Sequence, residues 1–373
     1  MQERRIWFKR LLINLENLKK NLEALKKFLP SETYILPVIK NDAYGHGLVE
    51  VARALSEKKV FGFGLSEPEE ALILRKAGFI HPILLLSGFE KDWLEDMYPL
   101  RITPVVASLK QMEWLIEFSL RKGISWEFHL KVDTGMHRFG LPLEELDKCL
   151  KKLKENPQLK ISGIMSHFAC AENPEHELTQ TQLNNFKNVV KIFQENNFIL
   201  KYIHFANSAG IIFLPEKGNL VRPGVSLFGS YPCFRARSYI RLYPVMTLES
   251  RIVEIKKVKK GEYAGYGPGF VAKKECVLGL VPVGYGDGYL RSLSNKGFAF
   301  VRNKRVPVVG IISMKALYLD LTEIESPQPG EKVILLGGEK EEVPVDELAQ
   351  LAGTISYELF CSLGKSIPRE YRE

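Results

Sequence analysis

A lysine at the end of a short apolar segment is the first residue in this chain whose type and position suggest chemistry. Lys40 follows Leu36–Ile39, so its methylene stem is expected to rise from an apolar wall. Burial disfavours the charged ammonium and lowers the pKa of such an amine. An amine tuned in this way suits Schiff-base chemistry, and Schiff-base lysines commonly hold pyridoxal phosphate, which stabilises carbanions by withdrawing electrons.

Other polar groups follow apolar segments in the same manner. Arg138 lies within 131–140, and His167 directly follows the apolar run 161–166. Ser208 follows the apolar run 202–205, and Arg222 lies just before the run 225–228. Taken singly, each of these residues has an ordinary structural explanation as a solvated cation, a cap or a core residue. Their shared position on one rim of the predicted strands is what favours a common site.

The segment 207–224 has the residue types that bind a phosphate group. Ser208 offers a hydroxyl where a helix could start, and helix starts favour anions through free amide donors and the helix dipole. Gly224 would allow close approach of the backbone, and Tyr44 could add a hydroxyl donor. An ordinary serine cap and a turn glycine would explain the same residues without a ligand. The lysine and this segment together favour a phosphate site.

The elements that must position these residues form an alternating pattern over the first 230 residues. Short apolar runs alternate with amphipathic segments, which is typical of a parallel sheet covered by helices. Eight such units predict an α/β fold of the (β/α)8 TIM type, in which functional residues lie at the carboxyl ends of the strands. The expected strands are 34–40, 60–65, 82–86, 102–106, 126–132, 161–166, 202–205 and 225–228.

The pattern changes after about residue 239, where long helical segments give way to extended runs separated by Gly, Pro and Asn. This predicts a mostly-β second domain with one short helix at 345–352. We therefore expect a barrel over residues 9–240 and a mostly-β domain over 241–373, with residues 1–8 added to the second domain. The expected extended runs are 245–258, 276–283, 298–301, 306–312, 317–321 and 332–336.

Composition excludes several classes of protein. Hydrophobic residues make up 45% of the 373 residues, which excludes a disordered chain. The net charge of +8 is not gathered into a basic stripe with interleaved aromatics, so nucleic-acid binding is not expected. The five cysteines are scattered and no histidine pair has zinc spacing, so we expect free thiols and no metal. Residues 1–10 are basic without a following apolar region, and no run is long enough to span a membrane, which favours a cytoplasmic protein.

The motifs around these residues resemble those of the bacterial alanine racemase family, and the resemblance extends over the whole chain. Its strongest element is Val-Ile-Lys-Asn-Asp-Ala-Tyr-Gly-His-Gly at 38–47, which resembles the pyridoxal-lysine motif of that family. Further matching motifs occur in order at 131–140, 166–169, 207–209, 221–229, 265–267, 283–289, 313–314 and 354–357.

The resemblance implies a two-base exchange of L-alanine and D-alanine on a pyridoxal-phosphate aldimine, which would supply D-alanine for peptidoglycan. Lys40 matches the lysine of the internal aldimine, and Tyr266 matches the second base, which comes from the partner subunit of a homodimer. These two positions are therefore the expected catalytic residues, and the active sites are expected to be composite.

The resemblance also implies supporting and binding residues. Arg222 matches the group facing the pyridine nitrogen, and His167 matches the group that supports the tyrosine. Arg138 matches a residue near the phenolic oxygen that also helps to bind substrate, and Lys131 matches a lysine that is carbamylated in some members. The backbone N–H of Met314 would meet the substrate carboxylate. The expected cofactor contacts are Lys40, Tyr44, Ser208, Arg222, Gly224, Val225 and Tyr357.

The chain departs from the family pattern near the expected substrate entry. Ile311 stands where the family usually has arginine, Lys315 where it has aspartate, and Glu172 where aspartate is common, whereas Arg291 is kept. None of these changes removes an acid–base group, so they leave open a broad-specificity amino-acid racemase. A fold-related decarboxylase and a non-catalytic pyridoxal-phosphate-binding barrel are competing hypotheses, but the non-catalytic barrel lacks the second domain that carries Tyr266.

Overall fold

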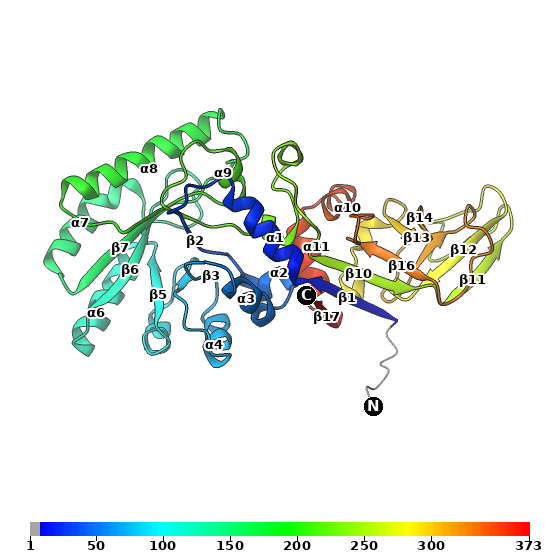
Figure 1. Cartoon of the computed structure of the whole chain (residues 1–373), viewed down its shortest axis with the longest axis horizontal. Helices are drawn as coiled ribbons and strands as arrows, with labels where there is room; N and C mark the ends of the chain where they lie inside the picture. The colour runs from blue at the N-terminus through cyan, green and yellow to red at the C-terminus, as the bar shows by residue number, and fades with distance from the viewer. Residues whose placement is uncertain (1–7) are drawn as a thin grey trace.

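The computed structural model describes residues 8–373 and divides into a (β/α)8 barrel and a β-rich domain (Figure 1). The expectations for residues 1–7, that they carry no signal and join the second domain, lie outside the described residues. No helix in the described part is long and apolar enough to cross a membrane. The barrel strands are β2 (Tyr34–Ile35), β3 (Phe63–Leu65), β4 (Ile83–Leu85), β5 (Ile102–Val106), β6 (Trp126–Lys131), β7 (Leu159–Met165), β8 (Tyr202–His204) and β9 (Leu220–Val221).

These strands close into a ring of parallel neighbours. Strands β3 to β8 pair in sequence order, and β2 pairs with β9. A bridge between Val38 and Gly64 joins β2 to β3, and the Asn219 amide donates to the Ile203 carbonyl beside β8 at 3.0 Å. The expected barrel is therefore confirmed, with most of its apolar strand residues buried, as is typical of a closed parallel sheet.

Helices cover the outer side of this ring, and Figure 1 shows α6, α7 and α8 outside β5, β6 and β7. Helix α6 illustrates how the sequence forms them: Ser108 caps its start by accepting from the Gln111 amide at 3.2 Å, and Gly123 ends it in the left-handed region. The barrel helices are α1 (Leu15–Lys26), α2 (Lys40–Gly45), α3 (Leu48–Ser56), α4 (Pro68–Lys76), α5 (Leu94–Met97), α6 (Leu109–Lys122), α7 (Leu146–Glu155), α8 (Glu177–Glu195) and α9 (Ser208–Phe213).

Two expected strands differ from the structure. The run 225–228 forms a 3-10 helix, η3 (Val225–Phe228), and the eighth strand is β9. Gly229, with φ of +85°, ends this turn, which an extended strand would not contain. The first strand, expected over 34–40, is regular only at β2, and Lys40 begins α2 instead of ending a strand. Arg222 and Gly224 consequently follow β9, at the carboxyl rim of the barrel.

The second domain is built on one nine-stranded sheet with the order β11-β12-β15-β14-β13-β16-β10-β1-β17. Its pairings are antiparallel except that of β1 with β17. Strand β1 lies in this sheet although its residues fall in the range expected for the barrel. The elements are β1 (Lys9–Asn14), β10 (Met246–Arg251), β11 (Glu254–Val258), β12 (Cys276–Val281), β13 (Phe298–Val301), β14 (Lys304–Val309), β15 (Leu317–Asp320), β16 (Lys332–Leu336), α10 (Val345–Ala352), α11 (Ser356–Gly364) and β17 (Arg369–Arg372).

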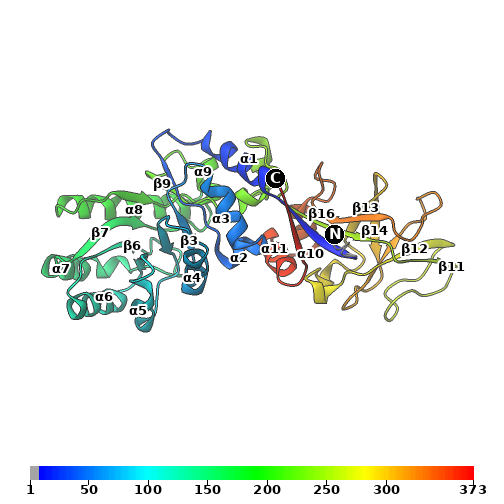
Figure 2. The ribbon, with the colours of Figure 1, turned by 60° about the horizontal axis from the view of Figure 1, so that its bottom comes forward.

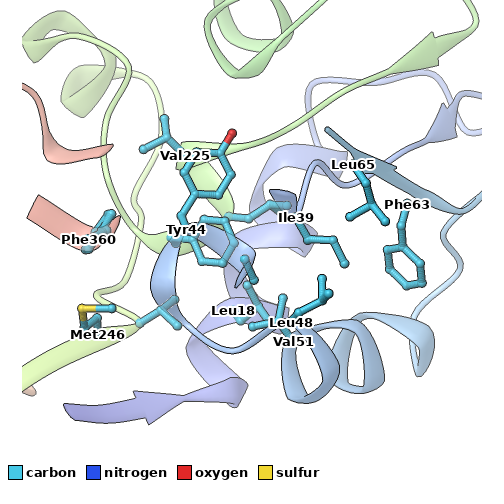
Figure 3. Packing of buried hydrophobic residues seen from close by; sticks show 14 of the residues in the cluster. Leu18, Ile39, Tyr44, Leu48, Val51, Phe63, Leu65, Val225, Met246 and Phe360 are labelled. Atoms are coloured by element: carbon cyan, nitrogen blue, oxygen red, sulfur yellow. The ribbon is translucent and has the colours of Figure 1, made fainter. Parts of the chain in front are cut away.

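The two parts are joined by a buried core and by polar contacts. Asn21 on α1 is fully buried, and its side chain donates to the carbonyls of Leu227 and Tyr243 and accepts from the Tyr243 amide. Figure 2 shows α2, α3 and α11 between the barrel and the C-terminal sheet. In the close view of Figure 3, Tyr44 and Phe360 belong to the same apolar cluster. The lysine-bearing segment therefore lies where the two domains pack.

Candidate active site

Lys40 lies at the carboxyl end of the first barrel unit, at the start of a turn with unusual handedness. Asn41, Asp42, Ala43 and Tyr44 all have φ near +54°, which makes α2 a left-handed helical turn. This conformation costs roughly 1–2 kcal/mol per L-residue, so neighbouring groups must hold it. Burial and the positive charge of Arg138 lower the pKa of the Lys40 amine, as the apolar segment before it predicts.

Three more cationic side chains gather around Lys40. Burial, followed by the charges of Arg222, Arg138 and Lys40, lowers the pKa of Lys131 to about 7. Lys131 ends β6, and its Nζ donates to the Leu86 carbonyl at 3.1 Å. The carboxylates of Glu70, Glu67 and Asp133 act on these two lysines in the opposite sense, but burial and the neighbouring cations prevail and lower both pKa values. Such a cluster is suited to an anionic ligand.

Arg222 is the most deeply buried of these cations. Its Nη2 donates to the Ser166 carbonyl at 2.6 Å, and its Nη1 donates to the His204 carbonyl at 2.7 Å. Burial alone lowers its pKa to about 9. His167 follows β7 close to the same cations, and burial together with Arg222 lowers its pKa well below the usual value. The charges of Lys40, Lys131, Arg138 and Arg222 all act on His167, so the five expected residues lie in one region, with the side chain of Arg138 exposed.

Two buried histidines behind Arg222 were not expected from the sequence. His204 faces Arg222 Nη1 through its Nδ1 at 3.0 Å, and its Nε2 lies 2.7 Å from Nδ1 of His129. Burial lowers the pKa of His129 to about 3, so this ring is neutral. Neutral neighbours let the guanidinium keep its orientation without a paired carboxylate. The sequence did offer one indication of these histidines, since each is a polar residue within an otherwise apolar strand, His129 in β6 and His204 in β8.

Ser208, Gly224, Tyr44 and Tyr357 form a polar group beside this cluster, which we call the cradle. Ser208, at the first position of α9, accepts from the Gly224 amide at 2.9 Å and from the Ser226 amide at 3.4 Å. A Cβ placed on Gly224 would lie 2.9 Å from the Tyr44 hydroxyl oxygen, so the glycine keeps this space free. The rings of Tyr44 and Tyr357 meet edge to face at 5.7 Å. Ser208, Gly224, Tyr44 and Tyr357 are therefore brought together, with Val225 directly after Gly224.

Tyr266 and Met314 are not part of this cluster within one chain. Tyr266 lies on the connection between β11 and β12, which Figures 1 and 2 place at the end of the C-terminal domain away from the barrel. Its side chain is 69% exposed, and that of Met314 is 57% exposed. Both are large apolar or aromatic groups on the surface of the C-terminal domain.

Two of the three residues that depart from the family pattern, Ile311 and Lys315, lie in the C-terminal domain, whereas Glu172 lies between β7 and α8 of the barrel. Ile311 lies under the Tyr266 connection, where its side chain closes on Gly269. Lys315 donates to the buried carboxylate of Asp287 at 2.6 Å, and Lys9 contacts the other oxygen of that carboxylate at 2.7 Å. Hydrogen bonds and ion pairs from both lysines lower the pKa of Asp287 against the effect of burial.

The lowered pKa of Lys131 gives a testable pH dependence of stability. The folded protein releases this proton near pH 7, whereas an unfolded lysine keeps it up to about 10.5. Between these values the unfolded chain binds the additional proton, so the free energy of unfolding rises with pH. In cofactor-free protein, we expect wild type to gain up to roughly 4 kcal/mol relative to Lys131→Met between about pH 7 and pH 10. Urea titrations at several pH values measure this, and parallel curves for the two proteins would contradict it.

Comparison with known proteins gives a consistent result over the whole chain. The family model for the alanine racemase N-terminal domain matches residues 13–232, and that for the C-terminal domain matches 245–371. An alanine racemase of Thermodesulfovibrio yellowstonii is 39% identical over 363 residues, which is 96% of each chain.

Solved structures agree with these matches. An alanine racemase of Clostridium difficile 630 superposes with a TM-score of 0.90 at 32% identity, over 99% of this chain and 96% of that one. The alanine racemase of Bartonella henselae with covalently bound pyridoxal phosphate gives a TM-score of 0.88 at 29% identity, over 98% and 100% of the two chains. The chain belongs to the alanine racemase family.

Proposed function

We propose that this chain, an isomerase that interconverts L-alanine and D-alanine with pyridoxal phosphate, uses Lys40 and Tyr266 on opposite faces of Cα, so that one group removes the α-proton and the other delivers a proton. The observation that carries the proposal is the gathering of Lys40 and three other cations at the barrel rim, next to the cradle of Ser208 and Gly224. Active sites and phosphate sites of (β/α)8 barrels lie at this rim, and the residues found there have the chemistry to bind an anion.

The residues at the rim fit the cofactor. Its phosphate would lie in the cradle, where Ser208, Tyr44 and Tyr357 present hydroxyl groups and Gly224 leaves room for the backbone to approach. Ser226 Oγ is buried there and has no hydrogen-bond partner among the described residues. The Lys40 amine would hold the cofactor covalently. Once bound, the cofactor withdraws electrons from Cα and so makes the α-proton acidic.

Racemisation requires a proton to leave one face of Cα and another to arrive on the opposite face. A single base would have to cross the plane of the reacting group, whereas two opposed groups avoid that movement. Lysine and tyrosine both titrate near 10 when unperturbed, so each needs tuning. Burial and Arg138 supply it for Lys40. For Tyr266, we propose that a hydrogen bond with His167, which Arg222 supports from behind, stabilises the phenolate.

Arg222 would face the ring nitrogen of the cofactor. The hydrogen bonds it makes to described residues occupy Nη1 and Nη2 and leave Nε for a ligand. A guanidinium in this position disfavours protonation of the ring nitrogen, because the protonated nitrogen would place a second positive charge next to the guanidinium. We propose that this limits the electron withdrawal by the ring and so restricts side reactions. Near the phenolic oxygen, we assign Arg138, oriented by Lys131, whose lowered pKa is also the condition for carbamate formation on its amine.

The second base must come from another copy of the chain. Tyr266 and Met314 are exposed, and Lys40 lies on the other domain. A twofold-related subunit could present Tyr266, and the Met314 amide for the substrate carboxylate, to the barrel rim of its partner. We therefore propose a homodimer with two composite sites, formed by a barrel domain that ends near residue 240 and a second domain over 241–373 that also includes β1. A cytoplasmic enzyme supplying D-alanine for peptidoglycan, without a nucleic-acid or membrane partner, agrees with this assignment.

The experiment that tests the proposal follows the α-proton of free amino acids in D2O. The purified protein with pyridoxal phosphate should exchange the α-proton of both alanine enantiomers and convert each into the other, as NMR and chiral chromatography would measure. Borohydride, which reduces a covalent lysine–cofactor link, should abolish the activity. Equal turnover of larger amino acids would instead favour the broad-specificity racemase, and absence of exchange with bound cofactor would contradict the proposal.

A further inference from the structure

The left-handed turn of α2 is held from one end by a carboxylate whose function is so far unexplained. Glu70 lies on α4, and its Oε1 accepts from the Asp42 backbone amide at 2.9 Å. Its second oxygen, Oε2, is buried and has no hydrogen-bond partner among residues 8–373. Asp42 is the second residue after Lys40 and one of the four residues in the left-handed region.

The turn needs such support because its own residues do not favour it. Asparagine and aspartate enter the left-handed region occasionally, but alanine and tyrosine rarely do, and four such residues in a row are exceptional for L-amino acids. A strained backbone persists only where the surrounding structure holds it, and such strain gathers at functional sites.

The C-terminal segment of the chain also holds the turn, at Asp42 and at Gly45. Arg369 on β17 pairs with the Asp42 carboxylate and donates through Nε to the Gly45 carbonyl at 3.0 Å. A Cβ on Gly45 would overlap the Phe360 carbonyl of α11, so the turn is pressed against that helix. Arg369 and α11 thus hold the Asp42 side chain and Gly45, while Glu70 holds the backbone amide of Asp42, two residues after Lys40.

The charge of Glu70 also acts on the Lys40 amine and favours its protonated form. The charged and titratable groups that act on Lys40 are Arg138, Glu70, Cys361 and Glu67, and Glu70 is the first of the carboxylates. Burial raises the pKa of Glu70, while the backbone amides of Asp42, Ser66 and Asn41 oppose that shift. A carboxylate that accepts from the Asp42 amide offers a counter-charge at a fixed place in a site otherwise rich in cations.

We propose that Glu70 is a positioning residue that holds the left-handed turn and so fixes the direction in which Lys40 enters the active site. This inference rests on the proposed function only in naming Lys40 as the reacting amine. It predicts that removing the Glu70 carboxylate loosens the turn locally and weakens retention of the cofactor, while the remainder of the barrel is unaffected.

The test uses the full-length protein loaded with pyridoxal phosphate and two measurements. Hydrogen exchange by mass spectrometry follows the backbone amides of 39–48, and hydroxylamine measures how fast the cofactor is removed. Glu70→Ala should speed exchange of these amides about tenfold or more, because a hydrogen bond to a charged group is lost. Cofactor removal should accelerate several-fold. Glu70→Gln, which keeps an acceptor oxygen, should restore most of the protection, and Glu69→Gln, an exposed carboxylate on the same helix, should match wild type in both measurements.

Three results would overturn the proposal: wild-type exchange in Glu70→Ala, faster exchange spread evenly over the barrel, or local loosening without faster cofactor removal. If Glu70→Ala does not fold, Glu70→Asp replaces it, because its carboxylate is one methylene too short to reach Asp42 and the same local loosening is expected. Hydrogen exchange at 39–48 is read without catalysis. If the racemase assignment were wrong, the effect of Glu70→Ala on hydrogen exchange would still be measurable. Failure of the assignment and failure of the Glu70 proposal can therefore be told apart.

Discussion

Replacing Lys40 by alanine is expected to reduce racemisation roughly 10⁴-fold or more, because the change removes both the covalent attachment of the cofactor and one proton-transfer group. Chiral chromatography of alanine after incubation with Lys40→Ala protein measures the loss. The variant should still bind pyridoxal phosphate non-covalently, since the cradle of Ser208, Gly224 and Tyr44 is unchanged.

Chemical rescue provides the control for this variant. Methylamine, a primary amine, should restore part of the activity of Lys40→Ala, whereas trimethylamine, which cannot form the covalent link, should not. Residual racemisation within tenfold of wild type in Lys40→Ala would show that another group performs the chemistry assigned to this amine.

Replacing Tyr266 by phenylalanine is expected to separate the two faces of the reaction. Loss of one acid–base group should slow racemisation by about 10²–10⁴-fold. Lys40 remains, so the variant should still exchange the α-proton of the alanine enantiomer whose proton points toward the amine. NMR in D2O, run separately with L-alanine and D-alanine, measures exchange of each enantiomer.

The matched control is Tyr263→Phe, which removes a phenol from the same connection between β11 and β12 and from a similarly exposed side chain. We expect its exchange and racemisation rates to equal those of wild type. If Tyr266→Phe slowed exchange of both enantiomers equally, the assignment of opposed faces to the two groups would be wrong.

The barrel was predictable from the sequence because its strands are buried on both faces and read as continuous apolar runs. Strands β5 and β6 were expected almost within their observed bounds. The run 225–228 is equally apolar, yet it forms η3, because Gly224 and Gly229 bend the chain and bring the Gly224 and Ser226 amides onto Ser208. Composition alone does not distinguish a buried strand from a buried turn of this kind.

The handedness of α2 was not predictable in the same way. The segment 41–44 carries no signal for the left-handed region, and contacts distant in sequence impose it: Glu70 on α4 and Arg369 on β17. The same limit explains the histidines behind Arg222. Lys40, Arg138 and His167 could be found because each follows a strand, whereas His129 and His204 are identified only by the side chains that they contact.

The most direct test of the central claim, that two chains share each active site, is to mix Lys40→Ala and Tyr266→Phe protein under conditions that exchange subunits. Each mixed dimer would contain one site with both groups intact, so an equal mixture should recover about a quarter of wild-type activity. Native mass spectrometry verifies that mixed dimers form. Activity near one quarter is the predicted result, and mixed dimers that remain as inactive as either parent would contradict the account.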